Sequence, residues 1–498
     1  MRLMRPRVCR APFGALVSEL PSIVRAPPAN FMICNASGSS IVGPYIGVTG
    51  TPVIDANANT LYVVAAVEIP TDSPPPPPAS YVLFAVDITS GAVKASTSVS
   101  GSVPGLAPST ECKTSSGQGT VTFDVNHLQR PALLLLGSGS SAVVYVGFVS
   151  GPVEGVGEFN NGWLFGYPFN GSAFSQPAIF NTTPNGTGGG IWQSGAGPAS
   201  DGNYIYLATG NGTFDLAGVQ NPSIDAGDTL LQLNPSNFAV HGYYTPSDVF
   251  TYNGNGRCTP PNDEDFGSGG VSLPPSGFSY NTMKVVINAD KESNLYVANQ
   301  GSLGGFNSNG GNNIQTLLEP HDSNGHKLDA DQGYWASPAY WEYMTGSTPT
   351  YMLYYSATTD TKQAAPYPIN GYQLATSGAS GPVPDPPTAS TVTGFCQYSP
   401  TPSVSSNGTT AGTGIVWAIE HGNSNNPSRN NCAGNSQQAA LHAFNATTMT
   451  ELYDSRGLPA GTTGSVTTFS TPTIFNGQVY IGTQTGVSVF GLCASCPH

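Results

Sequence analysis

The densest group of residues able to bind a metal ion is the acidic run Asp263, Glu264 and Asp265. The run stands just before the small residues of the segment 267–270, GSGG, which favour a flexible loop. Carboxylate oxygens on a bendable loop suit Ca²⁺, which takes about six to eight oxygen ligands. We therefore treat these three residues as a candidate metal site, with a solvated acidic loop as the alternative.

Aromatic side chains form the second group of residues that could take part in a functional site. Four tryptophans lie at or near the starts of expected strands, namely Trp192, Trp335, Trp341 and Trp417. Their faces could stack on a sugar ring or a flat cofactor, and the alternative is that they fill space between sheets. They are our candidate ligand-binding residues. The sequence shows no Ser-His-Asp nucleophile motif and no phosphate-binding glycine loop, so it points to no catalytic residue.

A repeated short apolar strand must position these residues. Its seven copies begin at Leu61, Val144, Ile205, Leu295, Leu353, Val416 and Val479. Most copies are followed by a second strand, and no helical periodicity separates the two. Because each small sheet of such a repeat can bury its faces only against neighbouring copies, the pattern predicts an all-β protein, a β-propeller. We expect seven blades, with eight as the alternative.

Proline and the chain ends add detail to this prediction. A small residue followed by proline recurs at 197–198, 337–338 and 471–472, and proline at a strand start removes no ladder hydrogen bond. The last expected strands are too few for a four-stranded blade, so we expect the N- and C-terminal strands to close the ring together. The predicted organisation is an Arg-containing disordered segment at 1–40, a single propeller domain at 41–493 and a tail at 494–498.

Composition excludes several partners. Charged residues make up 9% of the chain, against about 25% in ordinary domains, and the net charge is -14. A chain with this charge and without a Lys/Arg cluster is not expected to bind nucleic acid. No run of about 18 apolar residues occurs, so we expect no membrane span.

Cysteines and glycosylation signals favour an oxidising compartment. The eight cysteines are an even number and widely spaced, which predicts disulfides, with buried free thiols as the alternative. Candidate glycosylation sites follow the Asn-x-Ser/Thr pattern and are Asn35, Asn170, Asn181, Asn185, Asn211 and Asn407. We expect an extracellular or cell-wall associated glycoprotein, although no signal peptide is evident in the sequence.

Three phrases resemble the pyrroloquinoline-quinone-like repeats of the quinoprotein dehydrogenase-like propeller superfamily. They span 83–93 (LFAVDITSGAV), 180–215, which contains GGGIWQSGAGP, and 470–492. The resemblance implies a propeller from about residue 47 to 492. Catalytic members hold the quinone between a Trp and a disulfide of adjacent cysteines, beside calcium, and no two cysteines are adjacent here.

Because the quinone-binding motifs are missing, we consider two hypotheses for the function. The first is a secreted, non-catalytic binding or scaffolding module that engages extracellular glycans or proteins through its loops and needs no cofactor. The alternative is a quinone-dependent oxidoreductase, of the alcohol or sugar dehydrogenase type, with pyrroloquinoline quinone and calcium in a divergent site.

Overall fold

Short antiparallel strands make up nearly all of the regular structure. The computed structural model describes residues 9–11, 47–67, 80–105, 119–125, 127–149, 161–215, 225–247, 265–291, 294–317, 336–356, 367–395, 400–420, 424–425, 435–436, 439–458, 463–464, 469–483 and 486–491. Within these ranges the strands form seven sheets of four or five strands, together with two two-stranded ribbons. The fold is a seven-bladed β-propeller. This confirms the all-β prediction and the expected blade number.

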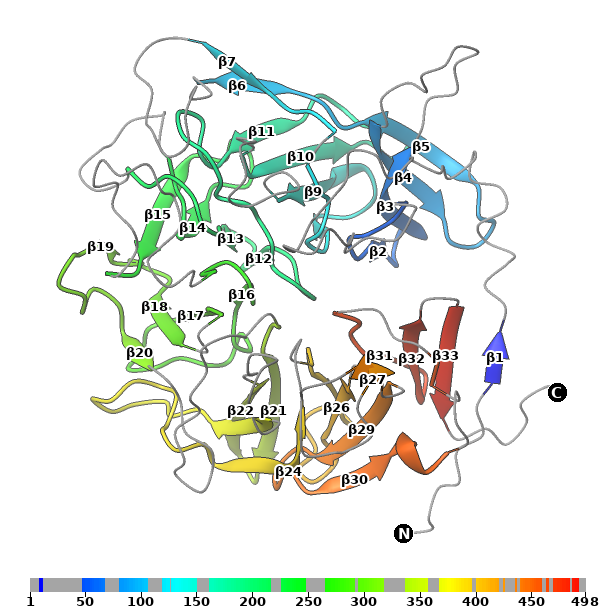
Figure 1. Cartoon of the computed structure of the whole chain (residues 1–498), viewed down its shortest axis with the longest axis vertical. Helices are drawn as coiled ribbons and strands as arrows, with labels where there is room; N and C mark the ends of the chain where they lie inside the picture. The colour runs from blue at the N-terminus through cyan, green and yellow to red at the C-terminus, as the bar shows by residue number, and fades with distance from the viewer. Residues whose placement is uncertain are drawn as a thin grey trace. The chain divides into compact units, whose positions relative to one another are not determined.

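The described chain divides into two compact units, one formed by residues 16–271 and 302–312, the other by 1–15, 272–301 and 313–498. The first unit holds blades 1 to 3, numbered in chain order (Figure 1). Blade 1 consists of β2 (Val53–Asp55), β3 (Thr60–Val67), β4 (Ser80–Asp87) and β5 (Val93–Ser98). Blade 2 consists of β8 (Leu134–Leu136), β9 (Ala142–Phe148), β10 (Trp163–Phe169) and β11 (Ala178–Asn181). Blade 3 consists of β12 (Ala199–Ser200), β13 (Ile205–Ala208), β14 (Leu230–Leu233), β15 (Val240–Thr245) and β19 (Gly305–Phe306).

The second unit holds blades 4 to 7, and β16 spans the division between the units. Blade 4 consists of β16 (Val271–Ser272), β17 (Val285–Ala289), β18 (Leu295–Asn299) and β20 (Gln315–Leu317). Blade 5 consists of β21 (Ala339–Thr345), β22 (Thr348–Ser356), β23 (Tyr367–Gln373) and β24 (Ala389–Phe395). Blade 6 consists of β25 (Ser403–Ser405), β26 (Ile415–Glu420), β29 (Ala440–Asn445) and β30 (Glu451–Asp454). Blade 7 consists of β31 (Thr473–Phe475), β32 (Gln478–Thr483), β33 (Gly486–Gly491) and β1 (Cys9–Ala11).

Each of the seven predicted repeat copies forms a central strand of one blade, the third strand in blade 4 and the second strand in the other six. These strands are β3, β9, β13, β18, β22, β26 and β32. Proline directly precedes the first strand of blades 1, 3, 5 and 7, at Pro52, Pro198, Pro338 and Pro472. The predicted role of proline at strand starts is therefore confirmed.

The cores lie between adjacent blades. In the first unit, Tyr81 of blade 1 meets Phe148 of blade 2 edge to face, with ring centroids 5.1 Å apart. In the second unit, the Tyr354 hydroxyl of blade 5 donates to the Ala446 carbonyl, just after β29 of blade 6, at 2.6 Å. Because neighbouring blades cover both faces of a sheet, the central strands are apolar on both faces rather than alternating.

The fourth strand of blade 7 comes from the N-terminal end of the chain. Strand β1 pairs antiparallel with β33, with Cys9 opposite Val489. A terminal strand therefore completes this sheet, as the sequence predicted. It belongs to the segment 1–40, upstream of the range predicted for the propeller domain.

Two outer edges in the first unit are covered by segments of the chain itself. Strand β19 pairs in parallel with β15, the outer strand of blade 3, and Phe306 packs on Phe214 with ring centroids 5.2 Å apart. The ribbon of β6 (Ser102–Pro104) and β7 (Thr120–Thr122) contacts β11, the outer strand of blade 2 (Figure 1). Such coverage blocks unwanted strand pairing at a sheet edge.

Helical structure is limited to the short turns η1 (Gly139–Ser141) and η2 (Ser455–Gly457) among the described residues. Over the same residues, no helix has the length and apolar character that crossing a bilayer would require.

Candidate functional site

A group of buried polar residues, the loop cluster, lies in the first unit between blades 2 and 3. Its loops follow β11, follow β13 and precede β14. The members share near-complete burial and are Thr182, Thr183, Asn185, Thr187, Thr209, Asn211, Thr213, Asp225, Asp228 and Thr229. Because glycine has no side chain, it allows the loops to approach each other closely. Gly188 has φ 77°, and a Cβ at this position would lie 2.3 Å from the Asn211 carbonyl oxygen.

Asp225 is the titratable centre of the loop cluster. Its side chain is fully buried, and Oδ1 accepts a hydrogen bond from the Asn185 N–H at 2.9 Å. Burial raises the pKa of Asp225 to about 7, and the negative charge of Asp215 adds to this, while the N–H groups of Asn185 and Gly186 act in the opposite direction. Asp225 therefore fixes a turn and changes its charge near neutral pH.

The structure brings two predicted candidates close together beside this cluster. A Cβ on Gly210 would lie 3.0 Å from Cδ1 of Trp192, and the next residue, Asn211, donates from Nδ2 to Asp265 Oδ1 at 3.1 Å. The Arg130 guanidinium lies over the Trp192 ring, with its carbon 5.9 Å from the ring centroid. Trp192 and Asp265 thus join one packed polar region.

These residues do not fit the quinone and calcium that the resemblance implies. Asn211 turns its amide nitrogen toward Asp265, whereas a shared Ca²⁺ would need oxygens from both residues. Arg130 already covers the Trp192 ring on which a quinone would stack. The other two acidic candidates, Asp263 and Glu264, lie outside the described residues.

The remaining tryptophan candidates that the structure describes make contacts within the protein. Trp341 is only 5% exposed, stacks on Tyr343 with ring centroids 4.6 Å apart, and donates from Nε1 to the Gly408 carbonyl. Trp417 is partly buried and donates from Nε1 to Ser405 Oγ at 2.8 Å. Packing, the alternative considered for these two residues, accounts for both. Trp335 lies outside the described residues.

Burial separates the candidate glycosylation sites into two groups. Asn170 and Asn407 are exposed, so solvent reaches both side chains. The candidates Asn181, Asn185 and Asn211 are 4%, 7% and 7% exposed, so a glycan on any of them would disrupt packing. Asn35 and the cysteines other than Cys9, whose side chain is likewise not described, fall outside the described residues.

A second titratable group, the ion cluster, lies in blade 6. It consists of His442, Glu420, Glu451, Asp454 and Arg456. Strand β29 carries His442, and its neighbours β26 and β30 supply Glu420 and the other two acids. Arg456 follows in η2.

The imidazole of the ion cluster faces a carboxylate at each nitrogen. His442 is fully buried, with Nδ1 2.8 Å from Glu451 Oε1 and Nε2 3.3 Å from Glu420 Oε2. Burial alone would lower the pKa of His442, but the hydrogen bonds to both glutamates outweigh it and raise the pKa above its ordinary value. In turn, the hydrogen bond from His442 lowers the pKa of Glu451.

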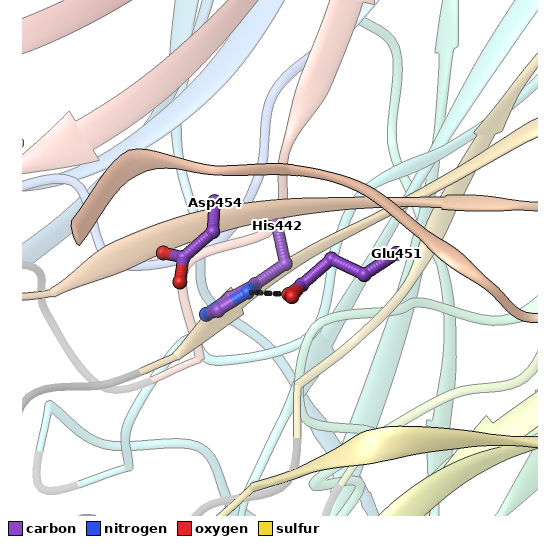
Figure 2. Close-up of side chains that lie close together, drawn as sticks. All are labelled: His442, Glu451 and Asp454. Carbon is purple, nitrogen blue, oxygen red and sulfur yellow. Dashed lines mark hydrogen bonds and ion pairs between the residues drawn. The ribbon is translucent and has the colours of Figure 1, made fainter. Parts of the chain in front are cut away.

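Arg456 forms ion pairs with two acids of the ion cluster. Arg456 Nε lies 2.9 Å from Asp454 Oδ2, and Nη1 lies 3.3 Å from Glu420 Oε2. Phe444 stacks on the His442 ring with centroids 6.0 Å apart, so one side of the cluster is apolar. Figure 2 shows His442 on its strand, with Glu451 and Asp454 on either side of the ring. One ligand atom from each of these three residues lies within 4.8 Å of the others.

Sequence reasoning missed the ion cluster, although a signal was present. The strand of segment 441–445, LHAFN, interrupts an apolar run with His442. In the hairpin of β29 and β30, His442 stands opposite Asp454, and Glu451 stands opposite the neighbouring Phe444. Aligning these two sequence segments as an antiparallel hairpin would have placed the acids beside the histidine.

Comparisons with known proteins found similar solved structures but no similar sequence. No family model matches the chain, and no curated protein sequence matches it. Similar solved structures include the quinohemoprotein alcohol dehydrogenase ADHIIG of Pseudomonas putida HK5, at 13% identity and a TM-score of 0.44, over 88% of this chain and 66% of that one. They also include the quinohemoprotein alcohol dehydrogenase of Comamonas testosteroni, at 13% identity and a TM-score of 0.38, over 91% of this chain and 76% of that one.

A third similar structure is BamB of Moraxella catarrhalis, at 10% identity and a TM-score of 0.37, over 88% of this chain and all of that one. At these identities and TM-scores the likeness carries no argument about what this chain does. The chain spans just under two thirds of the Pseudomonas enzyme.

Proposed function

We propose that the chain is a secreted, non-catalytic β-propeller that binds extracellular protein at the rim of blades 5 and 6. The observation that carries the proposal is a pair of exposed apolar side chains on neighbouring outer strands. Val392 of β24 is fully exposed at 104%, and Leu452 of β30 is 47% exposed. A hydrogen bond of 3.1 Å from Thr393 Oγ1 to Glu451 Oε1 joins the two strands beside this pair.

Both strands are the last of their sheets. Over the described ranges, no further strand pairs with the outer edge of β24 or β30, in contrast to β15, which β19 covers. An open edge that carries apolar side chains offers main-chain hydrogen bonds and buried area to an incoming protein segment. Burying one valine or leucine side chain fully contributes about 1.5–3 kcal/mol.

The chemistry of this rim favours protein over polysaccharide. Sugar rings are commonly held on aromatic faces, and the described tryptophan candidates are engaged in internal contacts. Nucleic acid is disfavoured by the net charge of -14. The extracellular location rests on the even cysteine count, the low charge content and the exposed acceptor sequences at Asn170 and Asn407.

Site-specific photo-crosslinking tests the rim directly. A photoreactive residue at position 392 or 452 is expected to capture the same extracellular protein, in each case competed by unlabelled wild-type chain. The matched control carries the photoreactive residue at Ile88, an apolar side chain of 40% exposure in a turn of blade 1. Equal capture from all three positions, or none from 392 and 452, would contradict the proposal.

The quinone-dependent alternative has its own assay. The purified chain would be incubated with pyrroloquinoline quinone and Ca²⁺ and tested for dye reduction with alcohols and sugars. We expect neither quinone binding nor turnover. Turnover that disappears in a Trp192→Ala variant would replace the binding module with an oxidoreductase.

A further inference from the structure

We propose that His442, Glu451 and Asp454 bind one Zn²⁺ ion in blade 6. The site adjoins the protein-binding rim and shares the Thr393–Glu451 hydrogen bond with it, but it does not depend on the proposed function. It consists of one imidazole and two carboxylates from the paired strands β29 and β30 (Figure 2). This set of one nitrogen and two oxygens favours Zn²⁺ over Ca²⁺ or Mg²⁺, which prefer oxygen alone.

The ligand spacing is close to that of a zinc centre. Two atoms bound to the same Zn²⁺, each at about 2.1 Å, lie at most about 4.2 Å apart. His442 Nδ1 and Glu451 Oε1 are already 2.8 Å apart, and the three ligand atoms lie within 4.8 Å of one another. A side-chain shift of less than about 1 Å therefore assembles the site.

Surrounding groups already orient the three ligands. The N–H and Nε–H groups of Arg456 donate to Asp454, and Thr393 Oγ1 donates to Glu451 Oε1 at 3.1 Å. A carboxylate has about four lone-pair positions, so these hydrogen bonds leave room for a metal. Whichever imidazole nitrogen binds Zn²⁺, the other keeps a carboxylate acceptor, Glu451 at Nδ1 or Glu420 at Nε2. Such carboxylate partners hold histidine ligands in metalloproteins.

Charge balance favours a dication. The three carboxylates of the ion cluster and the Arg456 guanidinium together leave two negative charges. Zn²⁺ bound by these residues would compensate both charges. Because the acid side chains are only 15–35% exposed, water screens the remaining charge incompletely.

The site is reachable and partly open. The Glu451 and Asp454 side chains are 35% and 25% exposed, so an ion can enter from solvent and water can complete its coordination. His442, in contrast, is fully buried. This combination of a buried nitrogen ligand and solvent-facing oxygens resembles three-ligand zinc sites with an open position.

Equilibrium dialysis of the chelator-stripped full-length chain against Zn²⁺ tests the proposal. We compare the bound metal of wild type with that of Glu451→Gln, Asp454→Asn and His442→Gln, and use Asp201→Asn as the control. Asp201 is an exposed aspartate that caps a turn of blade 3 by accepting from the Asn203 and Tyr204 N–H groups. We expect each ligand variant to bind one Zn²⁺ fewer than wild type, and the control to match wild type.

Two further measurements keep the test decisive if a variant folds poorly. Glu420→Gln removes the negative charge of a supporting acceptor but no ligand, and we expect it to weaken binding about 10–100-fold. Co²⁺ in place of Zn²⁺ should give visible absorption bands in wild type that the Glu451→Gln variant lacks. Equal Zn²⁺ binding by wild type and by a folded Glu451→Gln variant would overturn the proposal and leave the cluster as an ion-pair network.

Discussion

Replacing Asp225 by asparagine should make the protein more stable above neutral pH. The pKa of Asp225 is about 7 in the folded chain against an ordinary value of 3.8. The folded state therefore binds more protons than the unfolded state between these two values. The carboxyl contributes its full stability below pH 3.8, and that stability is lost as the pH rises toward 7.

The size of the effect follows from the same two values. One pH unit corresponds to about 1.4 kcal/mol, so the shift from 3.8 to about 7 sets an upper limit of about 4 kcal/mol. Asparagine keeps an oxygen to accept the Asn185 N–H and carries no charge at any pH. We expect the variant to equal wild type near pH 4 and to exceed it by up to about 4 kcal/mol at pH 8.

Urea unfolding followed by fluorescence at pH 4, 6 and 8 measures this difference. Hydrogen exchange at the Asn185 and Gly186 amides reports whether the turn loosens in wild type above pH 7. Asp201→Asn again serves as the control, because it removes an exposed aspartate. If Asp225→Asn tracks wild type at every pH, or is less stable at pH 8, then burial does not govern this carboxyl and the reasoning fails.

Three further substitutions and one matched control test packing and electrostatics. Tyr354→Phe should lower the free energy of unfolding by about 1–3 kcal/mol, since it leaves a buried carbonyl unsatisfied; an unchanged urea midpoint would contradict this. Gly188→Ala should cost at least about 2 kcal/mol through left-handed strain and the clash with Asn211. The matched Gly91→Ala has the same φ and no atom within 4 Å of its Cβ, so it should cost clearly less. His442→Gln in metal-free protein should cost about 1.5–3 kcal/mol, because it removes the imidazole from both glutamates and leaves them only Arg456 and Thr393 as partners; wild-type stability would show that the ion cluster is not stabilising.

The architecture could be predicted from the sequence because each blade repeats one local pattern. A buried strand such as 205–208 (IYLA) is apolar on both faces, and a proline such as Pro198 shows where a blade begins. These signals are local, so they can be recognised without knowing which distant segments are in contact. The sequence predicted that an N-terminal strand completes the last blade, but neither the segment that forms β1 nor the pairing of β19 could be located, because their partners are far away in sequence and their own segments are short.

The candidate sites were harder to predict for the same reason. A tryptophan such as Trp341 has the same signature whether it packs between sheets or binds a ligand, and only burial distinguishes the two. The acidic run that ends at Asp265 is easy to recognise because its three acidic residues are consecutive in the sequence. The ion cluster around His442 is just as dense in space, but its members are spread from Glu420 to Arg456. Cross-strand register, rather than sequence spacing, brings them together.

The pairing of Cys9 with Val489 also sets the timing of folding during synthesis. The ribosome must add about 480 further residues before β1 can meet its partner, which takes roughly half a minute to a minute and a half at about 5–20 residues per second. Throughout that interval, β1 cannot pair with β33. Blade 7 is therefore the last of the described sheets to be completed, and β1 is exposed to mispairing until then.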